Sequence, residues 1–123
     1  MPKILLVEDD NLTRTILGQF LRANGYEVEV AADGAQALSL LKENKFDLVV
    51  SDVIMPNGNG WDLSAHVSSI SPDTPVLLMT AYAGVQTQSR QAQSRAMPEV
   101  ILKPLMLTDL LSKIQNLLRQ KNS

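Results

Sequence analysis

The amino-acid sequence predicts an α/β domain in which five strands alternate with five helices. Short apolar runs rich in Val, Ile and Leu recur along the chain, and such runs are typical of strands buried on both faces of a parallel sheet. Segments with apolar residues at helical spacing lie between these runs, and turn-forming residues separate the two kinds of segment. The expected strands are residues 4–7, 26–31, 48–50, 76–79 and 100–102. Parallel strands joined in this way need right-handed crossover connections.

The boundaries of the first two helices are marked by residues that favour helix ends. Asp10 or Asn11 can cap the first helix, and Asn24 with Gly25 can end it. Residues 26–31 alternate between apolar and acidic side chains, which is typical of a strand near a sheet edge. Asp33 and Gly34 then turn the chain into the second helix. The apolar stripe of the first helix comprises Leu12, Ile16, Leu17, Phe20 and Leu21, and that of the second comprises Ala35, Ala37, Leu38 and Leu41.

The second half of the chain shows weaker signals. Residues 57–60 (NGNG) predict a loop, and the helix that follows over 61–70 ends at Ser71 and Pro72. Residues 83–97 are rich in Gln and Ser, which indicates a short, loosely held helix and makes it the expected mobile element. Thr108 can cap the last helix. Its apolar residues are Leu110, Leu111, Ile114, Leu117 and Leu118.

Length and composition restrict the class of protein. A chain of 123 residues is long enough for one domain with a core, and we expect residues 1–123 to form one. The net charge of −2 excludes a general attraction to nucleic acid or to an anionic membrane surface. The chain has no cysteine, which excludes disulfides, thiolate nucleophiles and cysteine zinc sites. We see no secretory or membrane-spanning segment, so we expect a cytoplasmic protein without a membrane partner.

Reactive residues follow four of the five expected strands. Glu8-Asp9-Asp10, Asp52, Thr80 and Lys103 each come directly after, or soon after, an apolar run. Because ligands bind at the carboxyl ends of the strands in an open parallel sheet, these side chains should meet at one edge. Carboxylates, a hydroxyl and an ammonium group together suit a divalent metal ion and a phosphoryl group.

The chemistry of such an edge centres on Asp52. A buried carboxylate beside Glu8 and Asp9 experiences like-charge repulsion, which a divalent cation would relieve. Mg²⁺ prefers hard oxygen ligands of this kind. A carboxylate next to the metal can attack phosphorus and form an acyl phosphate. Lys103 and the Thr80 hydroxyl could then bind two of the phosphoryl oxygens.

The motifs together resemble the receiver domains of two-component response regulators. The matching segments are residues 4–10 (ILLVEDD), residues 52–56 (DVIMP), Thr80-Ala81 and Lys103-Pro104, and their order and spacing match over essentially the whole chain. The resemblance implies a flavodoxin-like (βα)5 fold. That fold is a doubly wound, five-stranded parallel sheet of order 2-1-3-4-5 with helices on both faces.

The resemblance also implies a role for each residue of the edge. Asp52 is expected to be the phosphoacceptor, and Mg²⁺ to be held by Glu8, Asp9, Asp52 and the backbone carbonyl of Ile54. Thr80 is expected to be the switch hydroxyl and Lys103 the lysine that pairs with phosphate. The bond before Pro104 is expected to be a cis peptide bond, which X-Pro chemistry permits at low cost.

The expected partners also come from the resemblance. The phosphoryl donor would be a phosphohistidine on a sensor histidine kinase or a histidine phosphotransfer protein. Phosphorylation would change the face made by residues 83–97, the strand at 100–102 and the last helix, and so alter contacts with an output protein or domain or a second copy. No direct contact with nucleic acid is expected. Apart from its own phosphotransfer and slow dephosphorylation, the domain would not be an enzyme.

Three positions depart from the family pattern. Val100 stands where the family often has an aromatic residue, and Tyr82 is the nearest aromatic that could couple to Thr80 instead. Residues 95–98 (RAMP) replace the usual Gly-Ala pair before the fifth strand. Ile54, two residues after the acceptor, cannot position an attacking water by a hydrogen bond, so we expect slow self-dephosphorylation.

The sequence is also compatible with other functions. A Mg²⁺-dependent phosphohydrolase of the haloacid-dehalogenase type would need an acid at Ile54. A phosphate-independent binding module would not need the complete set of polar residues at the strand ends, and few aromatic residues are present to bind a flavin. His66 is expected on an exposed helix face rather than in a relay, and Trp61 is expected to be a packing residue.

Overall fold

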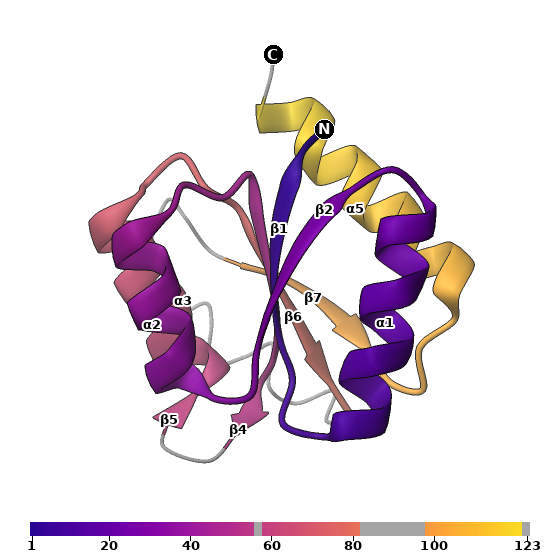
Figure 1. Cartoon of the computed structure of the whole chain (residues 1–123), viewed down its shortest axis with the longest axis horizontal. Coiled ribbons are helices and arrows are strands. Elements are labelled where there is room, and N and C mark those ends of the chain that lie inside the picture. The colour runs from indigo at the N-terminus through magenta and orange to yellow at the C-terminus, as the bar shows by residue number, and fades with distance from the viewer. Residues whose placement is uncertain (56–57, 82–97, 122–123) are drawn as a thin grey trace.

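The structure, a computed structural model, describes residues 1–55, 58–81 and 98–121, and its centre is a five-stranded parallel sheet (Figure 1). The strands lie in the order β2-β1-β3-β6-β7, which confirms the predicted order 2-1-3-4-5. Their bounds are β1 (Lys3–Val7), β2 (Glu27–Ala31), β3 (Leu48–Asp52), β6 (Val76–Thr80) and β7 (Glu99–Leu102). The strand predicted near an edge, β2, is the outermost strand on its side.

Helices cover both faces of this sheet, as Figure 1 shows. Helices α1 (Asn11–Ala23) and α5 (Leu107–Lys121) pack on one face, and α2 (Gly34–Glu43) and α3 (Gly60–Ile70) pack on the other. Four of the five predicted helices are therefore present. The fifth, predicted over residues 83–97, lies outside the described residues, as does Tyr82. None of the helices in the described ranges is long and apolar enough to cross a membrane.

The core is divided into two layers by the alternation of side chains along each strand. Ile4 and Leu6 of β1 pack toward α1 and α5, whereas Leu5 and Val7 pack toward α2 and α3. All four side chains are completely buried. Full burial of such a side chain stabilises the fold by about 1.5–3 kcal/mol. Because a shift of one residue would exchange the two layers, the position of each strand end is well defined.

Asp10 caps α1 as the sequence predicted, and the turn predicted at Asp33 leads into α2. The Asp10 carboxylate accepts hydrogen bonds from the Thr13 N–H at 2.8 Å and the Thr13 hydroxyl at 2.7 Å, and these bonds lower the pKa of Asp10. Asp33 caps α2, and Gly25 has a φ of 94° just after α1. The predicted cap of the last helix was wrong. Helix α5 begins at Leu107, so Thr108 lies within its first turn.

The segment after β3 reverses direction through a short strand pair that the sequence did not predict. Strand β4 (Ile54–Met55) pairs antiparallel with β5 (Gly58–Asn59). The N–H of Gly60 donates to the carbonyl of Val53 at 2.7 Å, and the Asn59 side chain caps α3. The described part of the turn-forming segment, Gly58 to Gly60, is therefore held by backbone pairing and by a helix cap.

Gly60 closes this reversal directly against the end of β3. A Cβ atom at this position would lie 2.7 Å from the carbonyl oxygen of Asp52 and 2.9 Å from a methyl carbon of Leu78. Both distances are too short for van der Waals contact. The position therefore requires glycine, and any side chain would displace the backbone of Asp52.

We predict that Gly60→Ala lowers the free energy of unfolding by about 1–3 kcal/mol, the usual cost of overpacking. Gly18→Ala is the matched control, because a Cβ there would meet its nearest neighbour, Arg22, at an ordinary 3.6 Å. Alanine in a helix interior is more favourable than glycine, so Gly18→Ala should raise stability by up to about 1 kcal/mol. Urea unfolding followed by circular dichroism measures both changes. Equal stability of the two variants would contradict the steric explanation.

Candidate functional site

The carboxyl ends of four strands bring the predicted residues to one edge of the sheet. Neighbouring strands end level with each other, since Val7 pairs with Ser51 and Asp52 pairs with Met79. Glu8 follows β1 directly, Asp52 and Thr80 are the last residues of β3 and β6, and Lys103 follows β7. These ends lie at the lower edge of the sheet in Figure 1.

Lys103 contacts two of the acidic side chains. Its Nζ donates to Oδ2 of Asp52 at 3.0 Å and lies 3.8 Å from Oε1 of Glu8. The Lys103 side chain is 29% exposed and that of Asp52 is 13% exposed, so the pair is only partly screened by water. The N–H of Lys103 donates to the carbonyl of Thr80 at 2.7 Å, and the peptide bond to Pro104 is cis, as predicted.

Glu8 is the most deeply buried acid at this edge, with 2% of its surface exposed. Its Oε2 accepts a hydrogen bond from the N–H of Asp10 at 3.1 Å, whereas Oε1 has no hydrogen-bond partner in the described part of the chain. Burial raises the pKa of Glu8 above the ordinary value of 4.5, and the charge of Asp52 acts in the same direction. The bond from Asp10 and the charge of Lys103 act in the opposite direction.

Three carboxylates at this edge have the geometry to share a cation. Glu8, Asp9 and Asp52 each offer a carboxylate oxygen within 4.8 Å of the others. Asp9 is exposed and Asp52 is half-buried, so a hydrated ion could approach them from solvent. Hard carboxylate oxygens, including the Glu8 Oε1 that lacks a hydrogen bond in the described part of the chain, suit Mg²⁺. The only positive group near this oxygen in the described residues is Lys103 at 3.8 Å, so a cation would lower the cost of burying the carboxylate.

The remaining predicted residues lie around this cluster. Thr80 is buried at the end of β6, next to β3 in the sheet. Ile54 begins β4, two residues beyond Asp52, and its side chain is 59% exposed. Val100 is half-buried and packs against the core layer under α2 and α3, as does Trp61. Trp61 is therefore a packing residue, as predicted, and His66 lies on the exposed face of α3.

Two residues with direct contacts to the site were not singled out from the sequence. Gly60 packs against the backbone of Asp52, and its only signal was membership of a turn-forming segment. The guanidinium group of Arg14 donates to the carbonyl of Glu8 at 2.8 Å. An arginine on a polar helix face carries no signal that distinguishes it from any solvated side chain.

An apolar surface adjoins the site on the side of α1. The predicted stripe of α1 is only partly buried, because Leu12 is 69% and Ile16 is 47% exposed. Met106, in the loop before α5, is 63% exposed. A hollow of about 330 Å³ lies between this helix and loop. It is lined by Thr13, Ile16, Leu17, Lys103, Pro104, Leu105 and Leu107.

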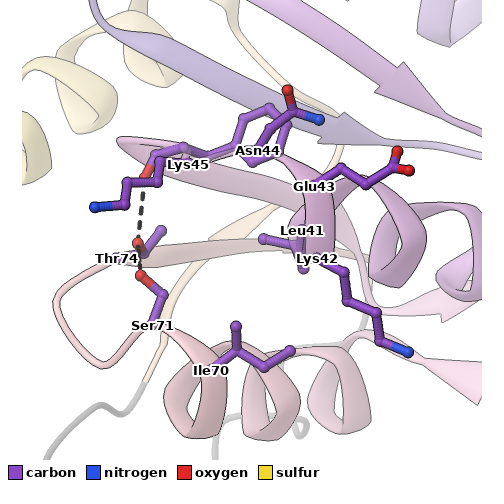
Figure 2. A pocket seen from close by; sticks show the side chains of 9 residues that line it. Leu41, Lys42, Glu43, Asn44, Lys45, Ile70, Ser71 and Thr74 are labelled. Carbon is purple, nitrogen blue, oxygen red and sulfur yellow. Dashed lines mark hydrogen bonds between the residues drawn. The ribbon is translucent and has the colours of Figure 1, made fainter.

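A second hollow, of about 350 Å³, lies at the opposite edge of the sheet (Figure 2). Its walls are the ends of α2 and α3 and the segments that lead into β3 and β6. Thr74 donates to the carbonyl of Phe46 at 3.2 Å, and its hydroxyl lies 2.7 Å from that of Ser71 (Figure 2). The hollow shares no residue with the acidic cluster and is separate from the candidate site.

Residues 4–115 match the family described as the response regulator receiver domain. The response regulator MprA of Mycobacterium sp. (strain KMS) is 37% identical over 118 residues, which are 96% of this chain and 51% of MprA. The probable transcriptional regulatory protein SilR of Salmonella typhimurium is 33% identical over 121 residues, which are 98% of this chain and 53% of SilR. The chain thus spans about half the length of these relatives.

Solved structures of receiver proteins share the fold. The response regulator TrrA of Thermotoga maritima, solved in complex with Mg(2+)-BeF, is 27% identical with a TM-score of 0.84, covering 95% of this chain and 99% of TrrA. A CheY-like receiver domain protein of Methanospirillum hungatei JF-1 is 28% identical with a TM-score of 0.90, covering 99% of this chain and 97% of that protein. By sequence, by fold and by the residues at its strand ends, the chain belongs to the receiver domains of two-component response regulators, which act as phosphorylation-activated switches.

Proposed function

We propose that residues 1–123 act as one receiver domain that accepts a phosphoryl group on Asp52. The donor is a phosphohistidine of a sensor histidine kinase or a histidine phosphotransfer protein. The observation that carries this proposal is the position of the Asp52 carboxylate, 3.0 Å from the Lys103 ammonium group and within reach of two further carboxylates. A nucleophile, a phosphate-pairing cation and a metal-binding set are thus present together.

In this proposal Mg²⁺ is held by Glu8, Asp9, Asp52 and the backbone carbonyl of Ile54. When bound, the ion supplies positive charge that neutralises the phosphoryl oxygens during transfer. The three carboxylates and the unpartnered oxygen of Glu8 support this assignment. The structure of TrrA with Mg(2+)-BeF supports it by analogy.

The protein side chains have separate parts in the transfer. A carboxylate oxygen of Asp52 attacks phosphorus, the bond between phosphorus and the donor imidazole nitrogen breaks, and the imidazole leaves with the electron pair. Lys103, which pairs with Asp52 before the reaction, then pairs with an oxygen of the phosphoryl group. Thr80, at the end of the adjacent strand, donates its hydroxyl hydrogen to another oxygen.

The phosphoryl donor needs a surface on which to dock beside Asp52. Leu12, Ile16 and Met106 are exposed apolar residues of α1 and the loop before α5, and Ile16 lines the hollow that Lys103 shares with the site. Apolar residues in this number on a small protein favour a protein partner. We therefore assign this side of the domain to the donor.

The output is assigned to a different face. This face comprises β7, α5 and residues 83–97, which lie outside the described residues. Its partner would be an output protein or domain, or a second copy of the chain. Residue 100 is a half-buried valine that packs against a core layer, so an inward rotation of an aromatic side chain cannot be the coupling step at this position. Tyr82 remains the proposed substitute. On this face Lys113 of α5 and Glu99 of β7 lie 3.9 Å apart, a surface pair that a partner could rearrange.

We predict that acetyl phosphate with Mg²⁺ adds the mass of one phosphoryl group to the wild-type chain and none to Asp52→Ala. Intact-mass spectrometry measures the adduct. Chelation of Mg²⁺ during the incubation should prevent the adduct from forming on the wild type as well. Continuous release of phosphate from several phosphomonoesters, without a stable adduct, would instead indicate the phosphohydrolase that the sequence left as an alternative.

We predict that Ile54→Asn shortens the lifetime of the phosphorylated domain by roughly tenfold, a modest part of what a positioned proton-transfer group can give. The exposed isoleucine side chain cannot orient a water molecule toward phosphorus, whereas an amide can. Loss of the mass adduct over time gives the rate. Ile70→Asn is the control, because Ile70 is similarly exposed at the distal end of α3. Equal lifetimes for the wild type and Ile54→Asn would refute this explanation.

We predict that Mg²⁺ and protons compete for Glu8. Its raised pKa means that, as the pH falls toward that pKa, Glu8 takes up a proton and Mg²⁺ affinity is lost sooner than for an ordinary glutamate. The carboxyl carbon of Glu8, followed by NMR, should titrate above 4.5 without Mg²⁺ and at lower pH with it. The spectrum of Glu8→Gln assigns the signal. A midpoint that does not change with Mg²⁺ would show that Glu8 is not a ligand.

A further inference from the structure

Arg14 reaches back from α1 to the turn that carries two of the acidic residues. Its Nη1 donates to the carbonyl oxygen of Glu8 at 2.8 Å and lies 3.5 Å from that of Asp9. Its Nη2 donates to the side chain of Asn11 at the start of the same helix. The guanidinium group therefore connects the rigid helix to the backbone of both acids, while their carboxylates remain available.

Among the described residues, other contacts in this turn leave one oxygen of the Glu8 carboxylate without a hydrogen bond. The N–H of Glu8 donates to Ala31 of β2 at 3.0 Å, and Oε2 of Glu8 accepts from the N–H of Asp10. The remaining oxygen, Oε1, is the one that lies near Lys103 without a hydrogen bond. Arg14 binds the Glu8 carbonyl, so the backbone N–H and the backbone C=O of Glu8 both have hydrogen-bond partners that fix their positions.

The charge of Arg14 by itself works against a cation site. A guanidinium group bound to the backbone of the acidic turn repels Mg²⁺ and should weaken its binding. If the arginine improves Mg²⁺ binding, it must do so by geometry, because three consecutive acidic residues repel one another and would spread the turn. Charge and geometry therefore predict opposite effects when Arg14 is removed.

We propose that Arg14 is a positioning residue that holds Glu8 and Asp9 in the arrangement that binds Mg²⁺ for phosphorylation of Asp52. The proposal rests on the proposed function, since it needs the metal site to exist. Residues that orient metal ligands from behind typically contribute 10- to 100-fold in affinity. The loss of Arg14 should therefore weaken Mg²⁺ binding on the order of tenfold.

Arg14→Met is the decisive variant, with Mg²⁺ affinity measured by isothermal titration calorimetry on the full chain. Methionine keeps an unbranched side chain and good helix propensity but has no donor and no charge. We expect weaker Mg²⁺ binding despite the loss of a repelling charge. Unchanged or tighter binding by Arg14→Met would overturn the proposal.

Arg22→Met is the matched control. Arg22 lies on the same helix and donates to the carbonyl of Val28 at 3.0 Å, far along the chain from the acidic turn. It should lose about as much stability as Arg14→Met but keep the Mg²⁺ affinity of the wild type. If both variants weaken Mg²⁺ binding equally, the effect is a general loss of stability and the proposal fails.

Arg14→Lys separates charge from geometry and also serves if Arg14→Met folds poorly. Lysine retains the charge but cannot bind Glu8 and Asn11 with the same planar group. Its affinity for Mg²⁺ should lie between those of the wild type and Arg14→Met. Affinity equal to that of the wild type would show that the planar contact is not needed.

Phosphorylation kinetics provide a second test that a structural role would not satisfy. With acetyl phosphate as donor, Arg14→Met should need more Mg²⁺ for half-maximal rate, while the rate at saturating Mg²⁺ stays close to that of the wild type. A lower rate at saturating Mg²⁺ with an unchanged half-saturating concentration would overturn the proposal. If the wild type neither binds Mg²⁺ nor forms an adduct, the proposed function fails, and the role of Arg14 fails with it. If the wild type does both, any change in Arg14→Met tests the role of Arg14 alone.

Discussion

The electrostatics of the candidate site depend on the close approach of three carboxylates. Glu8, Asp9 and Asp52 lie within 4.8 Å of one another, and Glu8 is almost completely buried. Such a group is unfavourable unless positive charge is supplied. Lys103 supplies part of it through contacts with Asp52 and Glu8, but one oxygen of Glu8 still lacks a hydrogen bond among the described residues. This incomplete compensation is what the proposed function uses, since a bound cation would supply the missing positive charge beside Asp52.

The sheet keeps these groups together. Side chains of β1, β3 and β6 pack into one core layer or the other in strict alternation, so the strands cannot slide without exposing apolar surface. The site residues lie at the ends of these strands or directly after them. Because the strand ends cannot shift, the positions of the site residues are also fixed. Gly60 also restricts the backbone of Asp52. Because glycine has no side chain, the start of α3 packs directly against the end of β3.

Two sides of the domain have different surfaces that suit different partners. Ile16 of α1 and Leu107 at the start of α5 line the same hollow as Lys103, which is the side that the proposed function assigns to the phosphoryl donor. The face of β7 and α5 carries the surface ion pair between Glu99 and Lys113, and the half-buried Val100 of β7 packs against a core layer. Under the proposed function, a donor and an output partner would therefore bind to largely different residues. This separation suits a domain that receives a signal and then passes it on.

The sequence by itself determined the strands, their approximate ends and the polar residues that follow them, because short apolar runs and turn residues are local signals. It also indicated the cap at Asp10 and the turn at Asp33 that leads into α2, which depend on contacts within one turn of helix. The sheet order came from the resemblance to receiver domains, and the structure confirmed it. Thr108 was misplaced because a cap residue within a helical turn has the same local signature one or two positions away.

Only the tertiary structure decided which buried groups lack a hydrogen bond among the described residues and which backbone groups of the site are bound by other side chains. The unpartnered oxygen of Glu8, the steric need for glycine at position 60 and the reach of Arg14 to the Glu8 carbonyl all depend on distances between separate elements. The pairing of β4 with β5 and the exposure of Leu12 and Ile16 depend on packing in the same way. Periodicity shows that a helix has an apolar stripe, but the neighbouring elements decide how far along the helix that stripe is covered.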